Sequence, residues 1–117
     1  MRLPALPIAG VRLGVAQAGI KYAGRDDLTL IEIAQGSTTA AVFTLNAFRA
    51  APVLVAERNN AAQDARYLLI NSGNANAGTG QPGMIACEQS CDDVALLTES
   101  DARRVLPCST GVSGAVL

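Results

Sequence analysis

The fold of this chain is decided by one stretch, Tyr67-Leu68-Leu69-Ile70-Asn71-Ser72-Gly73-Asn74-Ala75-Asn76-Ala77-Gly78-Thr79-Gly80-Gln81-Pro82-Gly83. Its first five residues are a short, mainly apolar run bounded by polar residues, which is typical of a buried strand. The Asn- and Gly-rich part favours neither helix nor strand. Pro82 and Gly83 then open a helix that runs to about Leu97, because proline suits a first helical turn. A strand, a Gly-rich loop and a helix in this order indicate an α+β fold with α/β character.

The expected helix carries one apolar stripe at three- and four-residue spacing. The stripe consists of Met84, Cys87, Cys91, Val94 or Ala95, and Thr98. Cys87 and Cys91 are therefore expected in the core, where free cysteines are common. A Cys-x3-Cys pair without further ligands nearby is a poor zinc site. The carboxylates Glu88, Asp92 and Asp93 are expected on a solvated face of the helix.

Other segments extend this picture on both sides. Leu28 to Ala34 and Thr38 to Thr44 are expected to pair as a hairpin around a Gln-Gly-Ser turn. Ala50 to Asn60 is ambiguous, although Pro52 is compatible with a first helical turn. A short helical turn with Ser100 as its N-cap should precede a strand over Val105 to Cys108. No repeat or linker interrupts the sequence, so residues 1–117 are interpreted as one domain.

Composition and charge exclude several classes of protein. Half of the residues are apolar, yet there are only two Phe, two Tyr and no Trp, so aliphatic side chains must build the core. The net charge is −1 and no basic block occurs, which argues against a nucleic-acid partner. No apolar run approaches the roughly 18 residues of a membrane span. Three cysteines without a recognisable secretory leader favour reduced thiols and a cytoplasmic location.

Histidine is absent, and this restricts the chemistry available within the chain. Ser-His-Asp triads, Cys-His pairs and His-containing metal sites are excluded, and neither a metal nor a resident cofactor is expected. Cys108 lacks an obvious base that would form its thiolate. Asp26 and Asp27 lie in a turn-like stretch, where local capping is the expected role.

Two loops remain as candidate sites. Ser109-Thr110-Gly111 follows a strand and could aim a hydroxyl and successive backbone N–H groups at one point, as an oxyanion hole requires. A plain turn is nevertheless the commoner outcome of such a triplet. The Gly73–Gly80 loop could present N–H groups to a nucleotide or another anion. It matches no phosphate-binding motif, however, and Asn71, Asn74 and Asn76 equally suit a tight loop held by its own side chains.

Taken together, these segments resemble the ornithine acetyltransferase (glutamate N-acetyltransferase) family of arginine biosynthesis. The resemblance rests on the run from Leu69 to Gly80, a helix, and then Leu106-Pro107-Cys108-Ser109-Thr110-Gly111-Val112. Supporting matches are Gly10-Val11-Arg12-Leu13-Gly14, Ala18-Gly19-Ile20-Lys21, Ala41-Val42-Phe43-Thr44 and Ala50-Ala51-Pro52-Val53. It covers nearly the whole chain in the expected order.

The resemblance implies an N-terminal-nucleophile type enzyme with a four-layer αββα fold, present here only in part. Such enzymes cut themselves before a Thr to give an α and a β chain, which associate as a hetero-oligomer. The freed Thr takes the acetyl group from N-acetylornithine and passes it to glutamate, and the use of acetyl-CoA as a second acetyl donor stays open. Thr110 and Gly111 match the oxyanion-hole pair, with Thr110 donating through its hydroxyl or its amide and Gly111 through its amide.

Some features depart from the family pattern. Cys108 and Ser113 stand where many relatives are expected to have apolar residues. The nucleophilic Thr and the substrate-binding residues have no counterpart before Leu117, so this chain is expected to be the N-terminal part of the α chain and inactive alone. Two rival functions stay open: a nucleotide- or anion-binding module that uses the Gly73–Gly80 loop, and a non-catalytic fragment that acts only by association through exposed strand edges.

Overall fold

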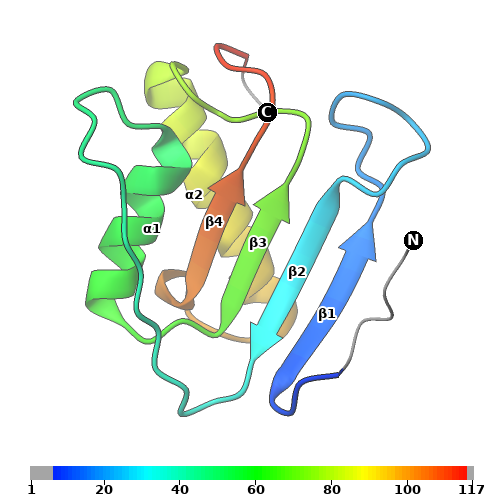
Figure 1. Ribbon diagram of the computed structural model, residues 1–117, viewed down its shortest axis with the longest axis vertical. Helices are drawn as coiled ribbons and strands as arrows, with labels where there is room; N and C mark the ends of the chain where they lie inside the picture. Colours follow the sequence, from blue (N-terminus) through cyan, green and yellow to red (C-terminus); the bar gives the residue numbers. More distant parts are fainter. Residues whose placement is uncertain (1–6, 116–117) are drawn as a thin grey trace.

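The computed structural model describes residues 7–115, which form a four-stranded sheet and two α-helices (Figure 1). The strands are β1 (Val11–Ala16), β2 (Leu28–Ile33), β3 (Tyr67–Asn71) and β4 (Val105–Ser109). The helices are α1 (Ala51–Ala62), α2 (Gly80–Thr98) and a short 3-10 helix η1 (Ala102–Arg104). One sheet layer and one helical layer make an α+β arrangement, half of the layers of a four-layer fold. The expectation about a secretory leader falls largely on residues 1–6, outside the described residues.

The sheet has the order β1-β2-β3-β4, and its last two strands are parallel. The β1–β2 and β2–β3 pairs are antiparallel. Parallel strands need a crossover connection, which α2 supplies between β3 and β4. The register pairs Tyr67 with Val105 and Asn71 with Ser109. Both strands therefore end at the same edge of the sheet, and the loops that follow them begin side by side.

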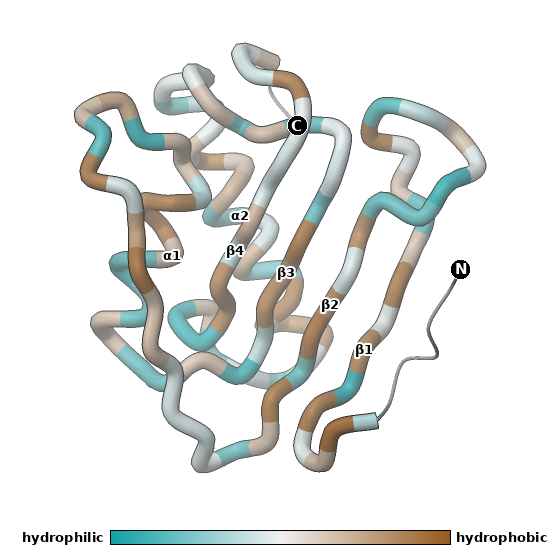
Figure 2. The backbone as a smooth tube through the Cα atoms, viewed as in Figure 1, coloured by the Kyte–Doolittle hydropathy of each residue, from teal (hydrophilic) through white to brown (hydrophobic). Residues whose placement is uncertain are grey.

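The core lies where α1 and α2 meet the sheet. Val105 is fully buried, and Val55, Tyr67, Cys87 and Cys91 pack in the same cluster. The apolar stripe expected for the long helix is confirmed, and both cysteines face the core. Figure 2 shows the apolar residues concentrated along the strands. Apart from Tyr67, this core is therefore built from aliphatic side chains and two thiols.

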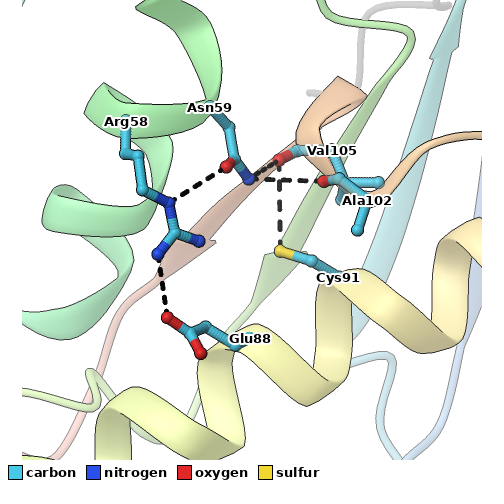
Figure 3. A network of polar contacts seen from close by, with 6 residues as sticks. All are labelled: Arg58, Asn59, Glu88, Cys91, Ala102 and Val105. Carbon is cyan, nitrogen blue, oxygen red and sulfur yellow. Dashed lines mark hydrogen bonds and ion pairs between the residues drawn. The ribbon is translucent and has the colours of Figure 1, made fainter. Parts of the chain in front are cut away.

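A polar network fastens α1 to the sheet and to α2 (Figure 3). The side-chain amide of Asn59 is 2% exposed and donates to the carbonyl oxygens of Val105 at 2.9 Å and Ala102 at 3.3 Å. On the solvent side, Arg58 forms an ion pair with Glu88 of α2 at 2.8 Å. Exposed pairs of this kind contribute little to stability, so the buried Asn59 is the more important tie.

The expected hairpin of Leu28–Ala34 with Thr38–Thr44 is wrong. Residues 38–44 form no strand; they belong to the long connection that leads from β2 to α1, and Phe43 packs against the cluster of Ala56, Ala65 and Leu106. The reason is competition for edges, because β1 pairs along one side of β2 and β3 along the other. The strand β1 did not stand out in the sequence, since it is a short, mostly exposed edge strand with a central glycine.

Two helix boundaries differ from expectation. The ambiguous segment from Ala50 is a helix, α1, with Pro52 in its first turn. Ser100 is not an N-cap; Asp101 caps η1 instead, and its carboxylate accepts from the Arg103 amide at 2.9 Å. The hydroxyl of Ser100 lies 2.8 Å from that of Thr98, so it is already engaged at the end of α2. Within residues 7–115, no helix has the length and apolar character needed to cross a membrane.

Candidate functional site

The two loops singled out in the sequence lie against each other at one end of the sheet. The Thr110 amide donates to the carbonyl oxygen of Asn71 at 3.0 Å. Two residues on, the Ala75 amide donates to the carbonyl oxygen of Val112 at 2.9 Å, and Asn74 pairs with Val112 as an isolated bridge. This contact extends the β3–β4 ladder past the strands, so the end of the sheet fixes Thr110 and Gly111 in place.

Only two hydrogen-bond donors of Thr110 and Gly111 remain available to a ligand. Because the Thr110 amide is bonded to Asn71, this residue can offer only its hydroxyl to a ligand. Across residues 7–115, neither the Thr110 hydroxyl nor the Gly111 amide has a hydrogen-bond partner in the protein, and both residues are exposed. From the sequence, Thr110 could donate through its hydroxyl or through its amide. In the structure only the hydroxyl is free to donate.

Gly111 could not be any other residue in this conformation. Its φ angle is +129°, in the region that side chains rarely adopt. A Cβ atom added there would lie 2.4 Å from the Gly73 carbonyl carbon and 2.6 Å from the Asn74 nitrogen. Glycine therefore allows the Thr110–Gly111 turn to lie directly on the Gly73 backbone.

Hydrogen bonds from a series of asparagine side chains hold the segments on both sides of this turn. Asn71 accepts from the Ser109 hydroxyl at 2.5 Å and donates to the Asn74 carbonyl oxygen at 2.8 Å. The Asn74 side chain in turn accepts from the Asn76 amide at 2.7 Å and donates to the Ala115 carbonyl oxygen at 2.8 Å. Asn71 and Asn74 are each 7% exposed. Their side chains hold the loops to each other.

The last asparagine ties the loop to the start of α2. Asn76 is fully buried, has a left-handed φ of 51°, and donates to the Gly83 carbonyl oxygen at 2.9 Å. Thr79 donates its hydroxyl to the Asn76 side chain at 2.6 Å. A Cβ at Gly83 would collide with both side chains. The polar groups of this loop bond to one another, which favours a scaffold and disfavours the nucleotide-binding alternative.

A hollow of about 410 Å³ opens beside Gly111. It is lined by Lys21, Tyr22, Arg25, Asp27, Ser72, Gly73, Gly111 and Val112. No site is predicted from the sequence for residues 21 to 25. Ala18-Gly19-Ile20-Lys21 appeared there only as a family match, and no spacing links this loop to a position about 90 residues away.

Asp27 shapes the wall of this hollow. Its carboxylate is 7% exposed and accepts from the amides of Ala18 at 2.6 Å and Ile20 at 2.9 Å. These backbone hydrogen bonds, first from Ala18 and then from Ile20, lower the pKa of the Asp27 carboxyl below its ordinary value. Asp27 therefore caps backbone amides of a more distant segment and not, as expected from the sequence, those of its own turn, and these bonds fix the path of the 18–20 backbone.

The three cysteines do not line the hollow beside Gly111. Burial raises the pKa of the Cys87 thiol to about 12 and that of the Cys91 thiol to about 11. Both therefore stay protonated at neutral pH and are poor nucleophiles. Cys108 is exposed on β4.

The chain resembles known proteins over most of its length. Residues 12–117 match the ArgJ family. The arginine biosynthesis bifunctional protein ArgJ of Methylococcus capsulatus is 60% identical over 111 residues, which are 95% of this chain and 27% of that protein. The protein of the same name from Pseudomonas syringae pv. tomato is 54% identical over 113 residues, 96% of this chain and 28% of that protein. The chain thus spans little more than a quarter of these relatives' length.

Two solved structures share the fold. The arginine biosynthesis bifunctional protein of Bacillus halodurans superposes with a TM-score of 0.87 at 32% identity, over 93% of this chain and 57% of that one. Ornithine acetyltransferase of Mycobacterium tuberculosis, solved in complex with ornithine, gives a TM-score of 0.86 at 36% identity, over 93% of this chain and 60% of that one. The family match extends over most of the sequence, from β1 through the Thr110–Gly111 turn, and the chain belongs to the ArgJ family.

Proposed function

We propose that this chain forms the oxyanion-hole part of a glutamate N-acetyltransferase, which moves an acetyl group from N2-acetylornithine to glutamate. One observation carries the proposal: in a turn whose backbone is held by the Thr110, Val112 and Gly114 amides, the Thr110 hydroxyl and the Gly111 amide are exposed and have no partner among the described residues. Family membership supplies the reaction class, since relatives are named for arginine biosynthesis and one bears the name ornithine acetyltransferase.

In this proposal a β chain brings a threonine nucleophile to the site. The threonine oxygen attacks the acetyl carbonyl carbon, and the bond to the ornithine nitrogen breaks once that nitrogen has been protonated. The amino group of glutamate then attacks the acetyl-threonine ester, which yields N-acetylglutamate and frees the hydroxyl. An α-amino group, with an ordinary pKa of about 8, can take up and return the proton near neutral pH.

The role of Thr110 and Gly111 follows from where charge develops. Each attack turns the carbonyl oxygen into an oxyanion, and preorganised donors stabilise that oxyanion more than the ground-state carbonyl. In other enzymes, removal of one such donor costs roughly 3 to 4 kcal/mol of transition-state stabilisation. The bonded Asn71–Asn76 loop is suited to hold donors rigidly in advance.

The proposal includes a partner and a location. The β chain arises by self-cleavage of a common precursor before its threonine, and it associates with this chain as a hetero-oligomer in the cytoplasm. The exposed apolar side chains of Leu13 and Val15 on β1 are consistent with a protein partner at that part of the sheet. No resident cofactor takes part, although acetyl-CoA can serve as an alternative acetyl donor.

The test is reconstitution. This chain is produced together with the remaining part of an ArgJ family protein, such as that of Methylococcus capsulatus, and the assembly is purified after cleavage. Transfer is followed with N2-acetylornithine and isotopically labelled glutamate, and acetyl-CoA is supplied in a parallel reaction. Labelled N-acetylglutamate is the expected product. A folded and cleaved assembly that yields none would contradict the proposal.

A further inference from the structure

A small cavity lies between α2 and the ends of β3 and β4, behind the strand that leads into the Thr110–Gly111 turn. It is lined by Leu69, Asn71, Asn76, Cys87, Ser90, Pro107 and Ser109. The cavity offers about 20 Å³ of space to the centre of a water-sized sphere. On this measure roughly 10 to 15 Å³ is enough for one water molecule. The cavity therefore has the size of a site for a single water and is too small for a substrate or a cofactor.

Polar side chains contribute to the wall of this cavity from several segments. Asn76 is fully buried and Asn71 is 7% exposed, whereas Ser90 and Ser109 are partly buried. Apolar cavities stay dry, and a buried water needs two to four polar partners. Four polar side chains around so small a space meet that requirement.

The two asparagines each retain one N–H group for an acceptor. A primary amide carries two N–H donors. Asn71 uses one on the Asn74 carbonyl oxygen at 2.8 Å, and Asn76 uses one on the Gly83 carbonyl oxygen at 2.9 Å. Among residues 7–115, neither side-chain nitrogen has a second acceptor. A buried N–H without a partner costs free energy, so an acceptor in the cavity is favoured.

The two serines offer the complementary groups. The Ser90 hydroxyl donates to the Ala86 carbonyl oxygen at 3.0 Å, and the Ser109 hydroxyl donates to the Asn71 side-chain oxygen at 2.5 Å. A hydroxyl has one hydrogen, which is used in both cases, while its oxygen can still accept. The cavity thus combines two free donors with two free acceptors, the set that a water molecule matches.

We propose that this cavity binds one structural water molecule, which accepts from the side-chain amides of Asn71 and Asn76 and donates to the hydroxyl oxygens of Ser90 and Ser109. In the part of the chain that the structure describes, no direct hydrogen bond joins Ser90 to either of the two strand ends. The water is therefore the polar link from α2 to the residue that precedes Thr110. This site goes beyond the proposed acetyl transfer and does not depend on it.

The first test is crystallography of the assembly of this chain with the remaining part of an ArgJ family protein, at a resolution that shows ordered waters. A density peak should lie about 2.7 to 3.2 Å from at least two of the four polar side chains. Ser90→Ala removes one acceptor and should lower the occupancy of this peak or abolish it.

Thr98→Val is the matched control on the same helix. The Thr98 hydroxyl also donates to the carbonyl oxygen four residues earlier, that of Val94, at 2.6 Å, but Thr98 does not line the cavity. The peak should keep its occupancy in this variant. Absence of a peak in the unaltered protein, or equal occupancy in Ser90→Ala, would overturn the proposal.

A second readout works in solution. Oxygen-17 relaxation dispersion counts the water molecules that stay bound for longer than the protein takes to tumble. The count should fall by about one in Ser90→Ala and stay constant in Thr98→Val, since one buried water is at stake. An equal count in all three proteins would contradict the site. Failure of the assembly to transfer acetyl groups would overturn the proposed function and leave these counts unaffected, so the two failures are distinguishable.

Discussion

The backbone amide of Thr110 and the carbonyl oxygen of Asn71 are joined by a hydrogen bond of 3.0 Å, which continues the β3–β4 ladder beyond the end of the sheet. This bond removes the Thr110 amide from the set of groups that can meet a substrate. The hydroxyl is the donor of Thr110 that remains for a substrate, and the first prediction follows from that.

Thr110→Ala should lower kcat of the assembled enzyme by about 10² to 10³-fold, with a smaller effect on KM, because the lost donor acts mainly in the transition state. Thr110→Ser keeps the hydroxyl and should stay within several-fold of the unaltered enzyme. Steady-state kinetics with N2-acetylornithine and glutamate measure both.

Ser113→Ala removes an exposed hydroxyl three residues further on and serves as the control. Full activity of Thr110→Ala would show that the hydroxyl is not a donor, since alanine leaves the backbone amide in place.

Gly111→Ala should prevent the Thr110–Gly111 turn from forming as observed. The new Cβ would lie 2.4 Å from the Gly73 carbonyl carbon, so the two loops would have to separate. Gly114→Ala is a matched control, because Gly114 also has a positive φ, +83°, yet nothing lies within 4 Å of its Cβ position. We expect Gly114→Ala to cost about 1 kcal/mol of backbone strain, and Gly111→Ala to cost clearly more. Thermal unfolding of the two variants would measure the difference, and equal midpoints would contradict this prediction.

Asn71→Ala should destabilise the protein by about 1 to 3 kcal/mol, since it leaves a hydroxyl and a carbonyl oxygen without partners at a buried position. The orphaned groups are the Ser109 hydroxyl and the Asn74 carbonyl oxygen. Ser109→Ala alone should cost less, and adding it to Asn71→Ala should recover part of the loss. Denaturant unfolding of the single and double variants gives the coupling, and strict additivity would argue against this network.

Reagents for free thiols should distinguish the three cysteines. Cys108 is exposed and should react rapidly at pH 8, whereas Cys87 and Cys91 are 3% and 2% exposed and should react only as fast as the protein opens. Their pKa values of about 12 and 11 also keep the thiolate scarce. Cys108→Ser should abolish the fast phase, and rapid labelling of all three thiols in the native protein would contradict the core position of Cys87 and Cys91.

Acid should weaken the loop held by Asp27. Its pKa is lower in the folded protein than in the unfolded chain, so its contribution to stability is present above the ordinary carboxyl pKa and is lost as pH falls through the folded value. Stability should therefore decline below about pH 4. Asp27→Asn should remove part of that decline, while Asp93→Asn, at an exposed site on α2, should not. Urea unfolding at pH 7 and pH 3 checks both variants.

Much of the fold follows from local patterns in the sequence. The strand from Tyr67 to Asn71, the helix stripe that contains Cys87 and Cys91, and the strand before Ser109 are all confirmed, because each buries side chains at its own period. The pairing of strands was harder to predict. Thr38 to Thr44 has strand-forming residues, but whether it pairs depends on which edges of β2 are free, and β1 and β3 occupy both.

The candidate site shows the same difference between local sequence patterns and contacts of distant segments. Thr110 and Gly111 are recognisable because their chemistry and their neighbours in sequence are distinctive. Lys21 and Arg25 cannot be recognised in this way from the sequence. They lie beside Gly111 only because β2 runs antiparallel to β1 and because residues 20–21 pass close to Gly73. Contacts between distant segments are set by packing, which local periodicity does not report.

The asparagine loop has a consequence for how this protein can vary. From Asn71 to Gly83 the side chains of all three asparagines and of Thr79 are committed to partners, and Gly83 has no room for a methyl group. Under saturation mutagenesis, Asn71, Asn76 and Gly83 should accept fewer replacements than exposed helical positions such as Gln89, although the loop belongs to neither helix nor strand up to Thr79. The segment with the least regular secondary structure is thus expected to tolerate the fewest substitutions.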